Sequence, residues 1–177
     1  MRPLLEAGMR RLANVQALIV DDNPQMRALI RTLLRGGGLT RTTEAEGADE
    51  ALELAAAARM DVVFADWLMR PTDGLTFVRT LRRSSGRSAD AAIVMVSAHS
   101  EASRVIAARD AGVNSFLVKP ISARSLFHHL STALNEDRPF VRCAAYVGPD
   151  RRRGAAPGYR GPFRRASDHA GEVVEIG

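Results

Sequence analysis

The sequence predicts an α/β fold in which five parallel strands form one sheet with helices on both faces. Short apolar runs suited to buried strands alternate with segments whose apolar residues recur at helical spacing. Five such strand–helix pairs follow one another between residues 15 and 135, and this alternation is typical of a doubly wound parallel sheet. Crossovers in such sheets are right-handed in about 98% of cases, and ligands bind at the carboxyl ends of the strands.

The first strand–helix pair carries the clearest signals. Residues 17–20 read ALIV, an uninterrupted apolar run expected of a strand buried on both faces. Pro24 suits the first turn of the helix that follows. The apolar face of that helix repeats at intervals of three and four residues and consists of Met26, Leu29, Ile30, Leu33 and Leu34. Three glycines at 36–38 end the helix.

The remaining elements continue the alternation. Further strands are expected over residues 39–44, 62–65, 93–96 and 116–118. Further helices are expected over residues 48–58, around 75–81, over 103–111 and around 126–134, with Gly112 ending the fourth helix.

Residues 1–14 are interpreted as a leader, residues 15–135 as the folded domain and residues 136–177 as a tail. The leader lacks the apolar block of a secretory signal. No run approaches the roughly 20 apolar residues of a membrane helix, and Cys143 is the only cysteine. We therefore expect a cytoplasmic protein without an internal disulfide and without membrane contact.

Chemically active side chains follow the expected strands. Asp21 and Asp22 end the first strand, Asp66 the third, Ser97 the fourth and Lys119 the fifth. A parallel sheet brings these ends to one edge, where three carboxylates repel one another unless a cation lies between them. Mg²⁺ is the expected cation. Asp66 would then be the nucleophile that accepts a phosphoryl group, with positive charge from the metal and Lys119 on the phosphoryl oxygens.

Each of these residues also has a structural interpretation. Asp21, Asp22 or Asp66 alone could cap a loop or a helix. Ser97 alone is compatible with a structural hydroxyl, and Lys119 with a solvated charge. Their joint occurrence at consecutive strand ends favours the phosphoacceptor site. Lys119 is the only lysine among 25 basic residues, which indicates a position that needs a compact ammonium, although codon bias is an alternative source of the arginine excess.

These segments resemble the response-regulator receiver family, of which the chemotaxis protein CheY is the small stand-alone type. The matching segments are LIVDD at 18–22, DWLM at 66–69, DGL at 73–75, VSA at 96–98 and FLVKP at 116–120. The resemblance implies a flavodoxin-like (βα)5 fold and a phosphoacceptor with at most self-dephosphorylation, rather than an enzyme. It implies direct Mg²⁺ contacts from Asp22, Asp66 and the Leu68 carbonyl, with Asp21 acting through water.

The resemblance also implies a switch in which Ser97 moves toward the phosphoryl group and Phe116 turns inward. A core role for Phe116 is an equal alternative. Two departures stand out. The family places Pro four residues after the phosphoacceptor, where this chain has Arg70 followed by Pro71. Leu68 occupies a position where polar residues are common, which bears on the rate of dephosphorylation.

The tail has a different composition. Between residues 138 and 165 it contains eight arginines and a single acidic residue, Asp150, which suits an anionic partner. No helix or strand period persists over 138–169, so we expect no ordered structure there without a partner. The pattern Y-x-G-P-x-R-R occurs at residues 146–152 and again at 159–165.

A repeated motif suits a ligand with two similar halves, and cyclic di-GMP has two guanines and two phosphates. Arginine binds guanine and phosphate through two parallel hydrogen bonds, aromatic rings stack on bases, and a carboxylate can accept from the guanine N1–H and N2 edge. The candidate residues are Tyr146, Asp150, Arg151, Arg152, Arg153, Tyr159, Arg160, Phe163, Arg164, Arg165 and Asp168.

A receiver followed by such a tail resembles the CheY-like cyclic di-GMP effectors, called Cle proteins, of flagellated alphaproteobacteria. The segments that carry this resemblance are residues 148–153 and 159–165. It implies a stand-alone response regulator that binds cyclic di-GMP through the tail and a protein through the receiver, with the flagellar motor switch as candidate partner and recruitment site.

Other hypotheses remain open. The alternative function is a phosphorelay shuttle or phosphate sink that is phosphorylated on Asp66 by a histidine kinase and carries an incidental solvated tail. A basic tail also suits an acidic protein surface or a nucleic acid, although nucleic acid is not the expected partner.

Overall fold

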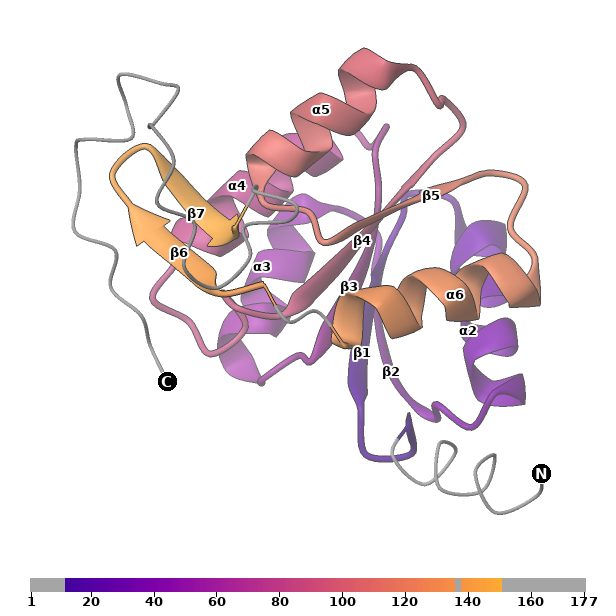
Figure 1. The fold of residues 1–177 in the computed structure, drawn as a ribbon. Helices are drawn as coiled ribbons and strands as arrows, with labels where there is room; N and C mark the ends of the chain where they lie inside the picture. The colour runs from indigo at the N-terminus through magenta and orange to yellow at the C-terminus, as the bar shows by residue number, and fades with distance from the viewer. Residues whose placement is uncertain (1–11, 136–137, 151–177) are drawn as a thin grey trace.

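The computed structural model describes residues 12–135 and 138–150 (Figure 1). Its first part contains five strands and five helices in strict alternation. The strands are β1 (Gln16–Val20), β2 (Arg41–Ala45), β3 (Val62–Asp66), β4 (Ala92–Ser97) and β5 (Ser115–Val118). The helices are α2 (Pro24–Gly36), α3 (Ala48–Ala57), α4 (Gly74–Arg83), α5 (Ala102–Ala111) and α6 (Ala123–Leu134).

All five strands are parallel and form one sheet in the order β2-β1-β3-β4-β5. Helices α2 and α6 cover one face, and α3, α4 and α5 cover the other (Figure 1). The central strands β3 and β4 are buried along their whole length, as expected for a parallel sheet covered on both sides. The predicted fold class is therefore confirmed.

The helix ends follow the local sequence. The Asn23 side chain caps α2 by accepting from the Gln25 N–H, and Pro24 begins the helix. The Asp73 side chain caps α4 by accepting from the Thr76 N–H. Gly112 ends α5 with a φ of 96°, a left-handed conformation that favours glycine. One detail differs from the sequence prediction, because Leu29 on the expected apolar face of α2 is 40% exposed.

Part of the tail is ordered, contrary to the sequence prediction. Strands β6 (Phe140–Cys143) and β7 (Tyr146–Pro149) form an antiparallel hairpin. The expectation of no ordered structure from residue 138 onward is therefore wrong for these residues. The hairpin lies beside α4 and the end of α5 (Figure 1). The rest of the expectation, for residues 151–169, lies outside the described residues.

Close contacts and a buried arginine hold the hairpin against the receiver. A Cβ on Gly148, whose φ is 152°, would lie 2.7 Å from the Cα of Gly112. Arg82 of α4 is 1% exposed and donates to Gly112 O at 3.0 Å. Its guanidinium also lies 5.3 Å from the ring centre of Phe140. Burial lowers the pKa of Arg82 to about 10, so the group remains charged at neutral pH.

Candidate phosphoacceptor and metal site

The sheet brings the predicted acidic residues together at its carboxyl edge. Oxygen atoms of Asp21, Asp22 and Asp66 lie within 4.8 Å of one another. Asp21 and Asp66 are 1% and 6% exposed, whereas Asp22 faces solvent. Two nearly buried carboxylates beside a third, open one form a cluster that a cation can reach from solvent.

Lys119 enters the same site from the end of β5. Its Nζ lies 2.7 Å from Asp66 Oδ1 and 3.5 Å from Asp21 Oδ2. Burial lowers the pKa of Lys119, but the hydrogen bond and charge of Asp66 and the charge of Asp21 outweigh burial, so the pKa is raised overall. Lys119 therefore keeps its positive charge beside the carboxylate that we expect to react.

The second oxygen of Asp21 is short of partners. Asp21 Oδ1 accepts from the Asn23 N–H at 2.8 Å, whereas the buried Oδ2 accepts no hydrogen bond. Burial raises the pKa of Asp21, and the Asp66 carboxylate adds to the rise; the Asn23 N–H and the Lys119 ammonium oppose it. A buried oxygen left in this state fits a hydrated divalent cation, so the residues present suit Mg²⁺.

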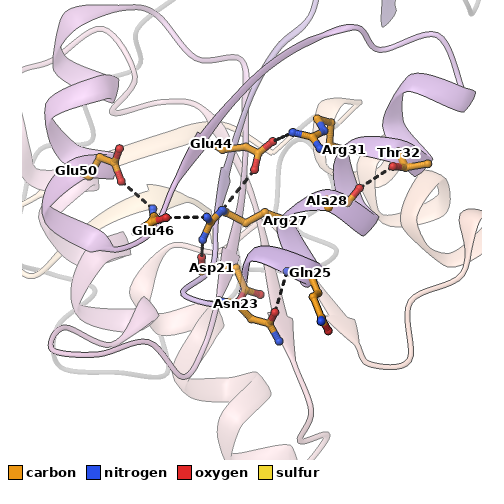
Figure 2. A network of polar contacts seen from close by, with 10 residues as sticks. All are labelled: Asp21, Asn23, Gln25, Arg27, Ala28, Arg31, Thr32, Glu44, Glu46 and Glu50. Carbon is orange, nitrogen blue, oxygen red and sulfur yellow. Dashed lines mark hydrogen bonds and ion pairs between the residues drawn. The ribbon is translucent and has the colours of Figure 1, made fainter.

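A buried arginine holds the loop that carries Asp21 and Asp22. Arg27 of α2 is 8% exposed and donates to the backbone oxygen of Asp21 at 2.8 Å (Figure 2). It also forms ion pairs with Glu44 at 3.4 Å and Glu46 at 2.9 Å. Sequence reasoning missed Arg27. Its position near the start of α2, facing Glu44 of β2 and Glu46 just after that strand, is visible only once the strands are paired.

The loop after Asp66 is held by backbone contacts. The Leu68 N–H donates to Asp66 Oδ2 at 2.9 Å, and the Gly74 N–H donates to Trp67 O at 3.0 Å. A Cβ at Gly74 would lie 2.1 Å from Asp66 O, so this position requires glycine. The Leu68 side chain is apolar and 56% exposed, so only the backbone carbonyl of this residue could offer a ligand atom to a metal.

Ser97 and Phe116 lie on the side of the site nearest β5. Ser97 is fully buried and follows Val96, the register partner of Asp66. Its Oγ accepts from the His99 N–H at 3.1 Å. Phe116 is half-buried, with its ring centre 6.1 Å from that of Trp67 in an edge-on arrangement. Because Trp67 directly follows Asp66, this contact is compatible with both the switch role and the core role of Phe116.

The candidate residues of the tail are only partly described. Tyr146 is 9% exposed, and its hydroxyl donates to Pro149 O at 2.6 Å. The Asp150 N–H donates to Pro139 O at 2.9 Å. In this conformation the Tyr146 side chain is nearly buried and presents little surface to a ligand. The other nine candidates lie outside the described residues: Arg151, Arg152, Arg153, Tyr159, Arg160, Phe163, Arg164, Arg165 and Asp168.

A surface groove runs along α5, β5 and α6. Its volume is about 730 Å³, and its lining includes Val105, Ile106, Phe116, Val118, His129 and Arg138. Val105, Ile106 and Val118 are 41%, 49% and 37% exposed. Exposed aliphatic side chains gathered in a groove are typical of a protein-binding surface. No helix in the described part of the chain is long and apolar enough to cross a membrane.

A parallel five-stranded sheet with an acidic cluster and a lysine at its carboxyl edge is the architecture of a two-component signalling domain. Residues 17–131 match the model of the response regulator receiver domain. The chain belongs to this family.

Relatives and solved structures agree with this assignment. The chain is 36% identical over 112 residues to the chemotaxis protein CheY of Pseudomonas aeruginosa, covering 63% of this chain and 90% of the relative. It is 33% identical over 113 residues to CheY-3 of Vibrio cholerae, covering 64% and 86%. The structure of the V. cholerae chemotaxis protein CheY4 is similar at a TM-score of 0.64 and 28% identity, covering 68% and 98%.

Proposed function

We propose that this receiver accepts a phosphoryl group on Asp66 and also serves as an effector of cyclic di-GMP through its arginine-rich tail. The observation that carries the second part is the β6–β7 hairpin. This hairpin holds the start of the tail against the receiver. In the sequence, the arginine run at 151–153 follows directly after Asp150, the last described residue.

The phosphoryl step follows from the acidic site. An Asp66 oxygen attacks the phosphorus of a phosphohistidine or a small phosphoryl donor, and the bond from phosphorus to the donor breaks with its electron pair leaving on the donor. In the resting state the Lys119 ammonium pairs with Asp66. After transfer it pairs with the phosphoryl oxygens and stabilises their negative charge. Asp22, Asp66 and the Leu68 carbonyl would hold Mg²⁺, with Asp21 acting through water, and the metal would supply further positive charge.

Acetyl phosphate with Mg²⁺ tests this step without a kinase. The wild-type protein should gain the mass of one phosphoryl group, and Asp66→Asn should not. Asp49→Asn, an exposed aspartate of α3, is the matched control and should label as wild type does. Labelling of Asp66→Asn to the wild-type extent would show that the acceptor lies elsewhere.

The hairpin also offers a route from the tail to the protein-binding groove. It packs on α4 and on the end of α5, and α5 supplies Val105 and Ile106 to the groove. We propose that cyclic di-GMP binding to the tail changes the affinity of this groove for a protein partner, with the flagellar motor switch as first candidate. Such coupling requires different ligand affinities in the two receiver states.

Calorimetric titration of cyclic di-GMP into the full chain tests the effector role. The intact protein should bind with low-micromolar Kd or tighter, and the variant with alanine at Arg151, Arg152, Arg164 and Arg165 should lose binding. The matched control carries alanine at four exposed receiver arginines, Arg35, Arg41, Arg79 and Arg124, which changes net charge equally. Absence of binding to the intact protein would overturn the effector role.

The second candidate is a phosphorelay shuttle or phosphate sink, favoured by the assembled acidic site alone. Rapid transfer from a kinase, together with no affinity for the dinucleotide, would support it. Steep salt dependence without preference for guanine would instead indicate nucleic-acid binding by the tail.

A further inference from the structure

A polar hollow lies between the hairpin and the amino-terminal edge of the sheet, at the end opposite the acidic site. Its volume is about 360 Å³. The segments before β3, β4 and β5 form one wall, and the hairpin with the preceding turn forms the other. The polar and aromatic lining includes Arg59, Asp61, Asp90, Asn114, Arg138 and Phe140.

Two charged side chains of the hollow are available to a ligand. Asp90 is exposed and forms no hydrogen bond or ion pair within residues 12–135 and 138–150. The Arg59 side chain is 66% exposed, and its Nε lies 3.8 Å from Asp61 Oδ1 in a loose pair. Asp61 is engaged structurally, because its Oδ2 accepts from the Gln16 N–H at 2.8 Å. The hollow thus offers one unpaired carboxylate and one nearby guanidinium.

Hydrogen bonds from the protein interior fix the segment that carries Asp90. The buried guanidinium of Arg82 donates to Ala89 O at 2.8 Å and to Ala91 O at 2.7 Å, one residue on each side of Asp90. The same guanidinium faces the Phe140 ring of the hairpin. Asp90 and the hairpin wall are therefore positioned by one buried group, and a preorganised site binds with a smaller loss of conformational entropy.

We propose that one guanine of cyclic di-GMP enters this hollow, so that two residues of the receiver take part in nucleotide binding. Asp90 accepts from the guanine N1–H and N2 amino groups, as carboxylates do at an amino-bearing base edge. Arg59 faces a phosphodiester oxygen. This inference rests on the proposed effector role and assigns two receiver residues to it.

Titrations of the full-length chain with cyclic di-GMP and cyclic di-AMP test the composite site. Adenine lacks the N1–H and the N2 amino group, so Asp90 should give the wild type a preference for the guanine ligand. Asp90→Asn should weaken cyclic di-GMP binding at least tenfold and reduce that preference. Arg59→Ala should weaken binding of both ligands. Asp49→Asn and Arg124→Ala, exposed and remote from the hollow, are the matched controls and should bind as wild type does.

The outcomes separate this inference from the proposed function. Wild-type binding that is unchanged in Asp90→Asn and Arg59→Ala overturns the composite site and leaves the tail as a sufficient effector. Absence of binding to the wild type overturns both. Thermal unfolding of each variant establishes that weakened binding comes from the site, since both side chains are exposed and the variants should keep the Tm of the wild type.

Discussion

At the scale of single residues, Asp21 stands out because its carboxylate is buried and only half satisfied. Its raised pKa means that the folded state binds the proton more tightly than the unfolded state does. As pH rises through the ordinary carboxyl range, the unfolded chain ionises first and the metal-free fold loses stability. Above the raised pKa that loss is complete, whereas well below the ordinary range both states are protonated and it vanishes.

Asp21→Asn should therefore stabilise the metal-free protein at pH 7. Asparagine keeps an oxygen for the Asn23 N–H and removes the charge. We expect a rise in Tm of about 2–4 °C in EDTA, the shift that about 1 kcal/mol produces in a protein of this size. Added Mg²⁺ should raise the Tm of the wild type more than that of the variant. A lower Tm for the variant in EDTA would contradict the interpretation of Asp21.

Gly74 is the second residue whose role can be isolated. An alanine Cβ there overlaps the Asp66 carbonyl oxygen and must displace the loop that carries the phosphoacceptor. We expect Gly74→Ala to lower the free energy of unfolding by about 1–3 kcal/mol and to weaken Mg²⁺ binding, followed by the fluorescence of Trp67, the only tryptophan.

Gly36→Ala is the matched control for that substitution. A Cβ at Gly36 meets nothing within 4 Å at the exposed end of α2, so alanine should stabilise the helix by about 0.5–1 kcal/mol. Equal stability of the two variants in urea would show that the Gly74 contact relaxes without cost.

At the scale of elements, the five strand–helix pairs were predictable because their signals are local. Buried parallel strands such as residues 62–65 require uninterrupted apolar runs, and α2 carries Pro24 and an apolar face. The strand ends in turn predicted the assembly of Asp21, Asp66 and Lys119, since a parallel sheet places all its carboxyl ends at one edge.

The hairpin was missed because its stability depends on tertiary contacts. Gly148 and Pro149 interrupt the strand pattern of β7, and the hairpin packs on α4 and α5 far away in the sequence. A usable signal was present in the strand-favouring residues 140–143 and 146–147 around a two-residue turn. Arg82 was missed for a similar reason, because nothing local shows that an arginine in a helix will be buried.

Arg82 contacts several of these elements, and its removal should lower the free energy of unfolding. It also donates to Asn114 Oδ1 at 2.9 Å, so it joins α4 to the segments before β4 and β5. Arg82→Ala leaves several buried carbonyl oxygens without a donor, and we expect a loss of about 3 kcal/mol or more in urea unfolding. The exposed neighbour Arg83 gives the control, since Arg83→Ala should change stability by about 0.5 kcal/mol or less. Similar losses in both variants would refute this role for Arg82.

At the scale of the whole molecule, the two ligand sites proposed above lie at opposite edges of the same sheet. The acidic site is at the carboxyl edge, and the hollow beneath the hairpin is at the amino edge. Arg138 lines both the hollow and the groove along α5, β5 and α6. Phe116, in edge-on contact with Trp67, also lines the groove. The groove is therefore the surface through which the two sites can influence each other.

This arrangement predicts thermodynamic linkage between phosphorylation and cyclic di-GMP. With Mg²⁺ and beryllofluoride as a phosphoryl mimic on Asp66, the Kd for cyclic di-GMP should change by about fivefold or more, the lower range of allosteric coupling. Reciprocity requires cyclic di-GMP to change the affinity for beryllofluoride by the same factor. Asp66→Asn, which cannot take the mimic, should show one Kd under both conditions. If the wild type also shows a single Kd, the two edges of the sheet act independently, and the groove does not connect them.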